Sequence, residues 1–189
     1  MAPRFGEVPR YGTAQCARVA RERLDDAREK AARFTAVPLE LVGTITPLPA
    51  AAPYLPWPGP AVRIIEHRAH APGHAALLIE HCGVLVAGDM LSDVEIPLLD
   101  LSSADPRSDY LAALDRFDDV VAGVAVVVPG HGAVGRGAEI RRRIDADRAY
   151  VRALREGREP ADPRVGPLAT YGRDWLPDEH RRQMQHALR

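Results

Sequence analysis

Three short turns in the second half of the sequence each place a histidine or an aspartate beside glycine. They are His70-Ala-Pro-Gly-His74, Val86-Ala-Gly-Asp89 and Val128-Pro-Gly-His131-Gly132. Ligands and catalytic groups are often loop residues that rigid strands hold in place. Glycine lets the backbone turn sharply and lets a ligand come close. The sequence therefore predicts one candidate site, made by His74, Asp89 and His131.

Two imidazoles and a carboxylate are metal-binding groups. They suit Zn²⁺, and also Fe²⁺ or Mn²⁺. A carboxylate can bridge two cations through its two oxygens, and two metals about 3.5–4 Å apart are a recurring device of hydrolases. A single Gly-His or Gly-Asp pair is more often a turn than a ligand. The prediction of a metal site therefore depends on all three turns occurring together, each at the end of an apolar run.

Strands must position these turns. Residues 62–67, 75–81 and 84–87 are expected strands, with Cys82-Gly83 as a two-residue hairpin turn between the last two. Residues 124–128 are a continuous apolar, largely β-branched run, which is typical of a strand buried on both faces. Each candidate residue then lies at or just beyond a strand end.

The remaining segments predict helices around these strands. A helix is expected over 13–34, capped by Thr13, stopped by Pro38 and burying Ala17, Val19, Ala20, Leu24 and Ala27. Further helices are expected over 109–121, 138–156 and 177–188, and a strand over 39–45. Residues 46–60 hold six prolines and must form a loop, in which Tyr54 and Trp57 either cover a core edge or line a substrate entrance. This order predicts an α/β or α+β layered architecture.

Composition excludes several function classes. The 189 residues carry a formal net charge of −1, so neither nucleic acid nor a membrane is an expected partner. The length suits one domain. Cys16 and Cys82 form no clustered pattern, no apolar run approaches the ~20 residues of a membrane span, and the first twelve residues lack the apolar core of a secretory signal. These observations favour a cytoplasmic protein.

Two runs of the sequence resemble a known family. The run APGHAALLIEHCGVLVAGDML and the later run VAVVVPGHG resemble the second half of the metallo-β-lactamase superfamily of metallohydrolases. The resemblance covers about residues 62–154, with 157–189 as a C-terminal connector and helix. It implies a single incomplete domain over 1–189, a partial αββα sandwich that corresponds mainly to the C-terminal half of that fold.

The resemblance also assigns roles to the three candidate residues. His74 would be the third histidine of a first metal site, Asp89 the carboxylate bridging two metals, and His131 a histidine of the second site. The family's His-x-His-x-Asp-His signature is absent from residues 1–68, where His67 is the only histidine. Either the native protein begins further upstream, an N-terminal truncation that we favour, or the chain is a degenerate member.

The resemblance implies a metal-dependent hydrolase that acts on a small molecule. In such enzymes a metal-activated water attacks an ester, thioester, amide or phosphoester bond. No catalytic residue can be assigned without the signature's aspartate, and the substrate-binding residues are unknown, so we expect this chain alone to be inactive or impaired. The alternatives are a non-catalytic remnant acting as a binding or structural module, and half of a split enzyme. Apolar sheet left exposed by the missing strands would favour self-association.

The other polar residues near the turns receive plainer interpretations. His70 is expected to be an exposed loop residue, with a second role behind the metal site as the alternative. His67 and His81 are expected in strands, and His180 and His186 on a solvated helix face. Ser92 and Asp93 are weak candidates for substrate contacts. Cys82 is expected to be incidental.

Overall fold

A five-stranded sheet forms the centre of the molecule. The computed structural model describes residues 8–34 and 38–188. Within them the sheet order is β3 (Val62–Glu66), β4 (Ala75–Ile79), β5 (Val84–Gly88), β6 (Val126–Pro129) and β7 (Gly135–Arg136). Neighbouring strands are antiparallel except β5 and β6, which run parallel. The carboxyl ends of β5 and β6 therefore meet at one edge of the sheet.

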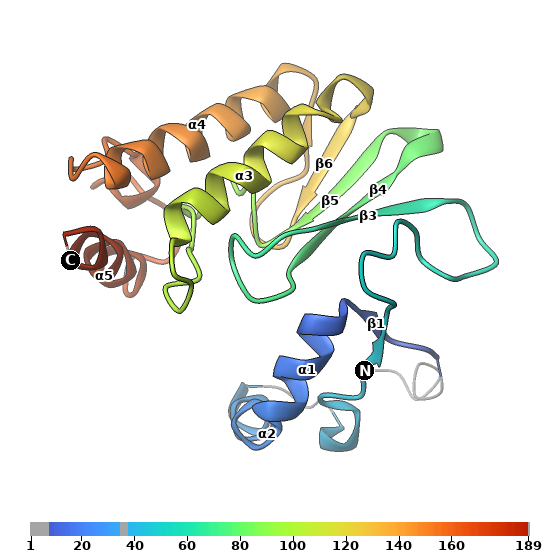
Figure 1. Cartoon of the computed structure of the whole chain (residues 1–189). Coiled ribbons are helices and arrows are strands. Elements are labelled where there is room, and N and C mark those ends of the chain that lie inside the picture. Colours follow the sequence, from blue (N-terminus) through green and yellow to red (C-terminus); the bar gives the residue numbers. More distant parts are fainter. Residues whose placement is uncertain (1–7, 35–37, 189) are drawn as a thin grey trace.

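Two long helices cover one face of this sheet. Helices α3 (Pro106–Asp118) and α4 (Ala138–Arg155) lie side by side against it (Figure 1). The core between sheet and helices is aliphatic and aromatic, as the apolar spacing of both helices predicts. Its fully or almost fully buried members include Leu78, Leu85, Val127, Leu114, Phe117 and Ile144. The α/β architecture expected from the sequence is confirmed.

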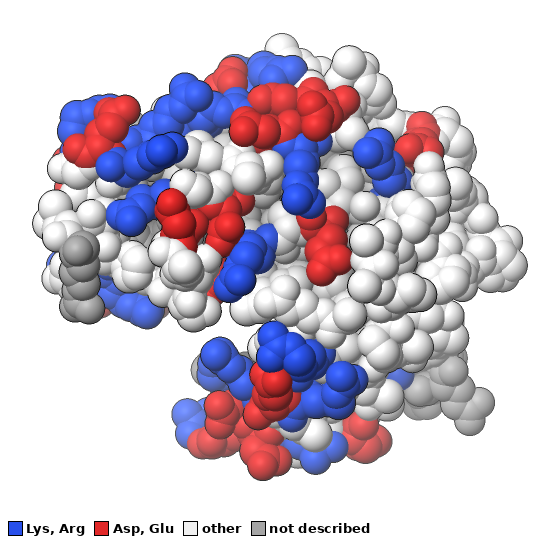
Figure 2. Space-filling model, in the orientation of Figure 1, with Lys and Arg blue, Asp and Glu red and all other residues white. Residues whose placement is uncertain are grey.

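The opposite face of the sheet is apolar but only partly covered. Ile64, Leu77, Val86 and Val128 pair across four neighbouring strands, and all four side chains are half-buried. The prediction that the β6 run is buried on both faces is therefore wrong, because only Val127 within the strand is fully buried. In Figure 2 the charged side chains gather over the helices, whereas the right-hand side is largely uncharged.

The predicted N-terminal helix is divided into two. Helix α1 (Ala14–Glu22) and helix α2 (Leu24–Phe34) meet at Arg23, and Figure 1 shows both at a distance from α3 and α4. Thr13 caps α1 as predicted, because its hydroxyl accepts the Cys16 N–H. Of the expected buried stripe only Ala17 is fully buried. The segment before Pro38, where the helix was expected to stop, lies outside the described residues.

The strand expected over residues 39–45 does not form. A short 3₁₀ helix, η2 (Leu39–Leu41), occupies its start, and Gly43 then turns the chain with a φ of 77°. Strand β1 (Tyr11–Gly12) instead pairs in parallel with β2 (Thr46–Pro47). In the loop that follows, Tyr54 bridges to Arg63. The Tyr54 and Trp57 side chains are both about half exposed, so neither belongs to the core.

The hairpin between β4 and β5 is longer than predicted. A 3₁₀ turn, η3 (Glu80–Cys82), and Gly83 in the left-handed region connect the strands, so His81 lies in this turn and not in a strand. Two further 3₁₀ turns, η4 (Val121–Gly123) and η5 (Pro163–Val165), precede β6 and follow α4.

The last helix, α5 (Leu176–Ala187), packs against α4 near the C-terminus (Figure 1). His180 on α5 was expected on a solvated face, but its imidazole is largely buried between the Tyr150 hydroxyl and the Glu159 carboxylate. No helix in the described part of the chain is both long and apolar enough to cross a bilayer.

Candidate functional site

The ends of β5 and β6 bring two of the three candidate residues together. Asp89 directly follows β5, and His131 lies two residues beyond β6. The Gly130 N–H donates to the Gly88 carbonyl, which ties the two turns to each other. His74 directly precedes β4, whose register with β5 leads it to the same edge. The sheet topology therefore brings the three candidate residues to one edge of the sheet, as the sequence predicted.

The Asp89 carboxylate lies between two imidazoles. Its Oδ1 is 3.7 Å from Nε2 of His131, and its Oδ2 is 3.4 Å from Nε2 of His70. Two donors bound to one tetrahedral zinc, each at about 2.1 Å, are about 3.4 Å apart. Both nitrogen–oxygen pairs are therefore spaced as donors that share a cation would be. The metal-binding role of Asp89 and His131 stays a prediction, with which this spacing is compatible.

His74 joins the site differently from the prediction. Its Nε2 accepts the backbone N–H of Asp89 at 3.1 Å, and its Nδ1 lies 3.3 Å from Nε2 of His67. Burial lowers the pKa of His74 to about 4 and that of His67 to about 3, so both rings are neutral near neutral pH. The Nε2 lone pair of His74 is engaged by the backbone, and a cation would have to displace that hydrogen bond.

His70 also belongs to the candidate site, because its imidazole lies beside Asp89. Its side chain is only 23% exposed, so the prediction of an exposed loop residue is wrong. The His70 Nδ1–H donates to the Leu98 carbonyl at 3.0 Å, because a carbonyl oxygen can only accept. A neutral His70 therefore carries its lone pair on Nε2, the atom that faces Asp89.

Glu95 and Tyr171 also belong to the site and were missed. His131 Nδ1 lies 3.6 Å from a Glu95 carboxylate oxygen and 3.3 Å from the Tyr171 hydroxyl. Glu95 is 5% exposed, and its burial raises its pKa against the opposing effects of His131 and Tyr171. Its one sequence signal was an acidic residue inside the apolar run 94–99. Tyr171 lies in the connector before α5 and gave no signal.

Gly130 and Gly88 leave the space that two side chains of the candidate site occupy. A Cβ atom on Gly130 would lie 2.1 Å from Oδ1 of Asp89, and a Cβ on Gly88 would lie 2.5 Å from Nε2 of His74. Gly88 also has a φ of 61°, which disfavours a side chain. Side chains of the site therefore come close to these two glycines, as the sequence predicted.

A buried carboxylate on α4 holds the loop that follows Asp89. Asp147, 1% exposed, accepts hydrogen bonds from the Leu91 N–H and the Tyr110 hydroxyl and pairs with Arg164 at 2.7 Å. Leu91 has a φ of 59°, which is unfavourable for a leucine. The Asp147 contact therefore fixes a strained turn two residues beyond the candidate ligand.

Arg143 connects this loop to the one after His131. Its guanidinium donates to the carbonyls of Leu91 and Ala133, and Asp93 accepts the Ala133 N–H. Ser92 accepts the N–H groups of Val94 and Glu95. The polar atoms of Ser92 and Asp93, weak candidates for substrate contacts, thus stabilise the loops of the site.

The described residues supply only part of a metal-binding set. In residues 8–34 and 38–188, no three or more His, Cys, Asp or Glu side chains are grouped so that they could hold one metal ion. Zinc sites ordinarily use three or more protein ligands. The donor chemistry fits a metal, whereas the number of donors converging on one point falls short.

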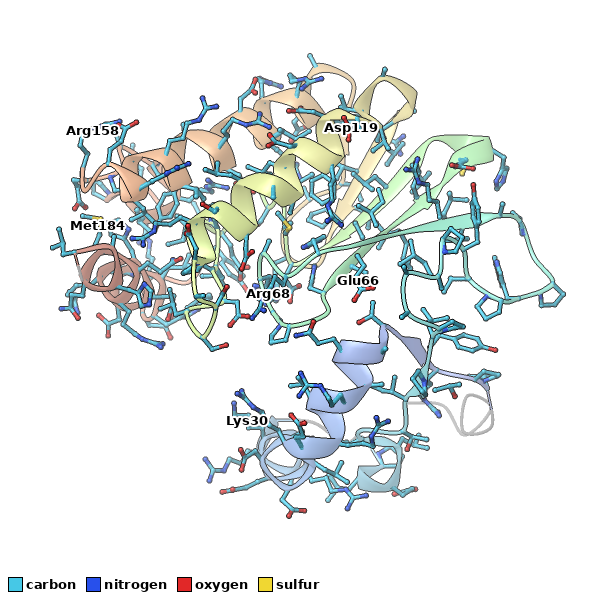
Figure 3. All side chains as sticks on the ribbon, in the orientation of Figure 1. Lys30, Glu66, Arg68, Asp119, Arg158 and Met184 are labelled. Carbon is cyan, nitrogen blue, oxygen red and sulfur yellow. The ribbon has the colours of Figure 1, made fainter. Side chains whose placement is uncertain are left out.

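A separate cavity of about 570 Å³ lies between α1, β3 and α3. His67 lines it and connects it to the candidate site through His74, whereas Asp89 and His131 are not among its lining residues. Figure 3 labels two further lining residues, Glu66 at the end of β3 and Arg68 just beyond it. Its walls carry charges of both signs, which gives no preference for an anionic or a cationic ligand.

A comparison with protein families finds one match, and it includes the candidate site. A family model for the metallo-beta-lactamase superfamily matches residues 55–131, a span that contains His70, His74, Asp89 and His131. Among curated proteins, none matches the chain.

Several solved structures share the fold. A metallo-beta-lactamase family protein from Thermus thermophilus is 26% identical with a TM-score of 0.57, over 79% of this chain and 54% of that one. A beta-lactamase domain protein from Burkholderia ambifaria is 25% identical with a TM-score of 0.57, over 79% and 48%. TTHA1623, solved in a di-iron-bound form, is 22% identical with a TM-score of 0.53, over 74% and 65%.

The chain spans about half the length of the first two of these proteins. The family match over residues 55–131 covers strands β3 to β6, helix α3 and the turns that carry the candidate residues. Residues 55–131 match the family model of the metallo-β-lactamase superfamily, and the fold is similar to that of metallo-beta-lactamase family proteins.

Proposed function

We propose that this chain carries part of the metal centre of a metal-dependent hydrolase that acts on a small molecule. The observation that supports it is the Asp89 carboxylate, whose two oxygens face Nε2 of His70 and Nε2 of His131 at 3.4 and 3.7 Å. A carboxylate in this position can serve two cations, which is the arrangement expected of a bridging ligand.

The proposed reaction is hydrolysis of an ester, thioester, amide or phosphoester bond. A bound metal would supply Lewis-acid activation of water and of the scissile group. The chain's own residues would hold the metal through Asp89 and His131, with His70 beside them, and the buried Asp147 would keep the Asp89 loop in place. Zinc, iron and manganese all suit these donors, and the di-iron form of TTHA1623 supports iron as one candidate.

The small number of metal-binding side chains that converge on one point favours a second candidate function. Because no group of three donors converges in the described residues, the chain could act as a non-catalytic binding module, or it could complete its site with ligands from another chain. Both alternatives predict weak or no metal binding by this chain in isolation.

Elemental analysis and a hydrolysis assay on the purified protein separate these functions. The proposal predicts bound zinc, iron or manganese. It also predicts that a chelator abolishes any turnover of a thioester, a lactone or a phosphodiester, which the incomplete site would keep low. His131→Ala should lose the metal, whereas His81→Ala, at an exposed histidine in the β4–β5 turn, should keep it. Protein that stays free of metal after zinc, iron and manganese are each added would contradict the metal centre in this chain and leave the two alternatives.

A further inference from the structure

His131 is held from its far side by two residues outside the turns. Nδ1, the ring nitrogen opposite Asp89, faces the Tyr171 hydroxyl at 3.3 Å and a Glu95 oxygen at 3.6 Å. Glu95 comes from the loop between β5 and α3, and Tyr171 from the connector before α5. Three segments that are well separated along the chain thus meet at one imidazole.

The hydrogen-bonding capacities of these groups fix where the protons lie. The Glu95 carboxylate faces Nδ1 at 3.6 Å and can only accept, so a proton between these two atoms must be on Nδ1. The Tyr171 oxygen, 3.3 Å from Nδ1, can then accept from His131 as well. The Nε2 lone pair of a neutral His131 is left facing Oδ1 of Asp89 at 3.7 Å.

His70 shows the same arrangement with a different partner. Its Nδ1–H donates to the Leu98 carbonyl, and its Nε2 faces Oδ2 of Asp89. Metal-binding histidines commonly donate their other ring N–H to a carboxylate or a carbonyl, which sets the tautomer and makes the free nitrogen a better ligand. Both histidines beside Asp89 therefore present an unprotonated Nε2 to the same carboxylate.

We propose that Glu95 and Tyr171 are positioning residues that hold His131 in the Nδ1–H tautomer, with Nε2 directed at the cation shared with Asp89. Burial supports this role for Glu95, which is 5% exposed and has few conformations open to it. Tyr171 connects Glu95 to His131 and is itself packed edge-on against Trp175. The inference rests on the proposed function, because it explains how a candidate metal ligand is prepared.

Nitrogen-15 NMR of the histidine rings in metal-free protein tests the proposal without requiring activity. At about pH 8 a histidine of ordinary pKa is neutral, and its two ring nitrogens then show which one carries the proton. Wild-type His131 should be mainly the Nδ1–H tautomer. Tyr171→Phe and Glu95→Gln should shift it towards the Nε2–H tautomer that exposed histidines favour.

Matched controls are available in the same spectra. His70, whose partner is a backbone carbonyl, should keep its Nδ1–H tautomer in every variant and so reports that the fold is intact. Tyr54→Phe and Glu80→Gln make the same chemical changes at exposed positions and should leave His131 unchanged. A wild-type His131 in the Nε2–H form, or one unaffected by both substitutions, would overturn the proposal.

A Zn²⁺ titration separates this inference from the proposed function. Tyr171→Phe and Glu95→Gln should each weaken Zn²⁺ binding at His131 by about 10-fold, the usual effect of losing such a partner. Wild-type His131 that is correctly protonated but unresponsive to Zn²⁺ would contradict the metal centre itself. Zn²⁺ affinity unchanged in both variants would contradict the positioning role alone.

Discussion

At the scale of single residues, the site is organised by one carboxylate and the glycine that makes room for it. Asp89 contacts all three other polar members of the turns: its oxygens face His70 and His131, and its N–H donates to His74. Its position depends on Gly130, whose missing side chain leaves the space that Oδ1 occupies. Small changes at Gly130 should therefore act on the carboxylate.

Gly130→Ala tests this dependence. The new Cβ would lie 2.1 Å from Asp89 Oδ1, so the carboxylate must rotate away from His131, and Zn²⁺ affinity measured by calorimetry should fall by about 10-fold or more. Gly123→Ala, where a Cβ would have nothing within 4 Å, should leave the affinity unchanged. Equal affinities for the two variants would show that the position of Asp89 does not matter for binding.

The sequence revealed those site residues that lie in glycine turns at strand ends, and it missed those that lie in irregular segments. Asp89 and His131 could be predicted because strand and turn signals surround them. His70 was misjudged because its partner, the Leu98 carbonyl, is 28 residues away. Glu95 and Tyr171 could not be predicted, since no periodicity links the loop after β5 to the connector before α5.

At the scale of elements, α3 is fixed at its start by a capping carboxylate. Asp105 accepts the Ser108 N–H at 3.0 Å, and this hydrogen bond lowers its pKa. The lowered pKa means that the folded state favours the charged form. The charged Asp105 cap therefore stabilises the fold fully above the pKa that Asp105 has in the unfolded chain. This stabilisation is lost as the pH falls through the pKa of Asp105 in the folded protein.

Asp105→Ala should lower the free energy of unfolding by about 1 kcal/mol near neutral pH. Asp105→Asn keeps a capping oxygen without the titrating group, so its difference from wild type should be largest near neutral pH and shrink as the pH falls to about 3. Urea unfolding at the two pH values measures both effects. If wild type and Asp105→Asn differ in unfolding free energy by the same amount at both pH values, the lowered pKa of Asp105 does not come from the cap.

Helix α4 contributes the buried Asp147 that secures the loop after Asp89. Asp147→Ala would leave the Arg164 guanidinium and the Leu91 N–H without this partner in a buried position, which should cost about 3 kcal/mol or more of unfolding free energy. Asp145→Ala, at an exposed position on the same helix, should change it by about 0.5 kcal/mol or less. Thermal or urea unfolding distinguishes them, and similar costs for both would refute the role of Asp147.

The elements with strong local signals were predicted well, and the others were not. Helices α3, α4 and α5 follow their apolar spacing to within a few residues, as do strands β3 and β5. The alternation over 39–45 predicted a strand, but a strand also needs a partner, and Gly43 turns the chain before one is reached. The break at Arg23 between α1 and α2 has no glycine or proline to announce it.

At the scale of the whole molecule, the sheet has one covered face and one half-exposed face. The row Ile64, Leu77, Val86 and Val128 is aliphatic on all four strands, and apolar sheet faces ordinarily pack against another layer about 10 Å away. The two relatives are about twice as long as this chain, and about half of each relative has no counterpart in it. We expect copies of this chain to associate through this face.

Sedimentation velocity over a range of concentrations tests that association. The mass of the wild-type protein should rise above the 20.6 kDa of one chain as the concentration increases. Leu77→Lys places a charge at the centre of the row and should keep the protein monomeric, whereas Glu80→Lys, at an exposed position in the β4–β5 turn, should not. A wild-type protein that is monomeric at all concentrations would contradict this expectation.

The central claim is that Asp89 is a ligand of a metal centre in this protein, and calorimetric titration of metal-free protein with Zn²⁺ tests it most directly. Asp89→Asn preserves the size of the side chain but removes its charge and one of its two acceptor oxygens. The account predicts that wild-type protein binds Zn²⁺ and that Asp89→Asn binds it at least about 10-fold more weakly. Equal affinities, or no binding by the wild-type protein, would contradict it.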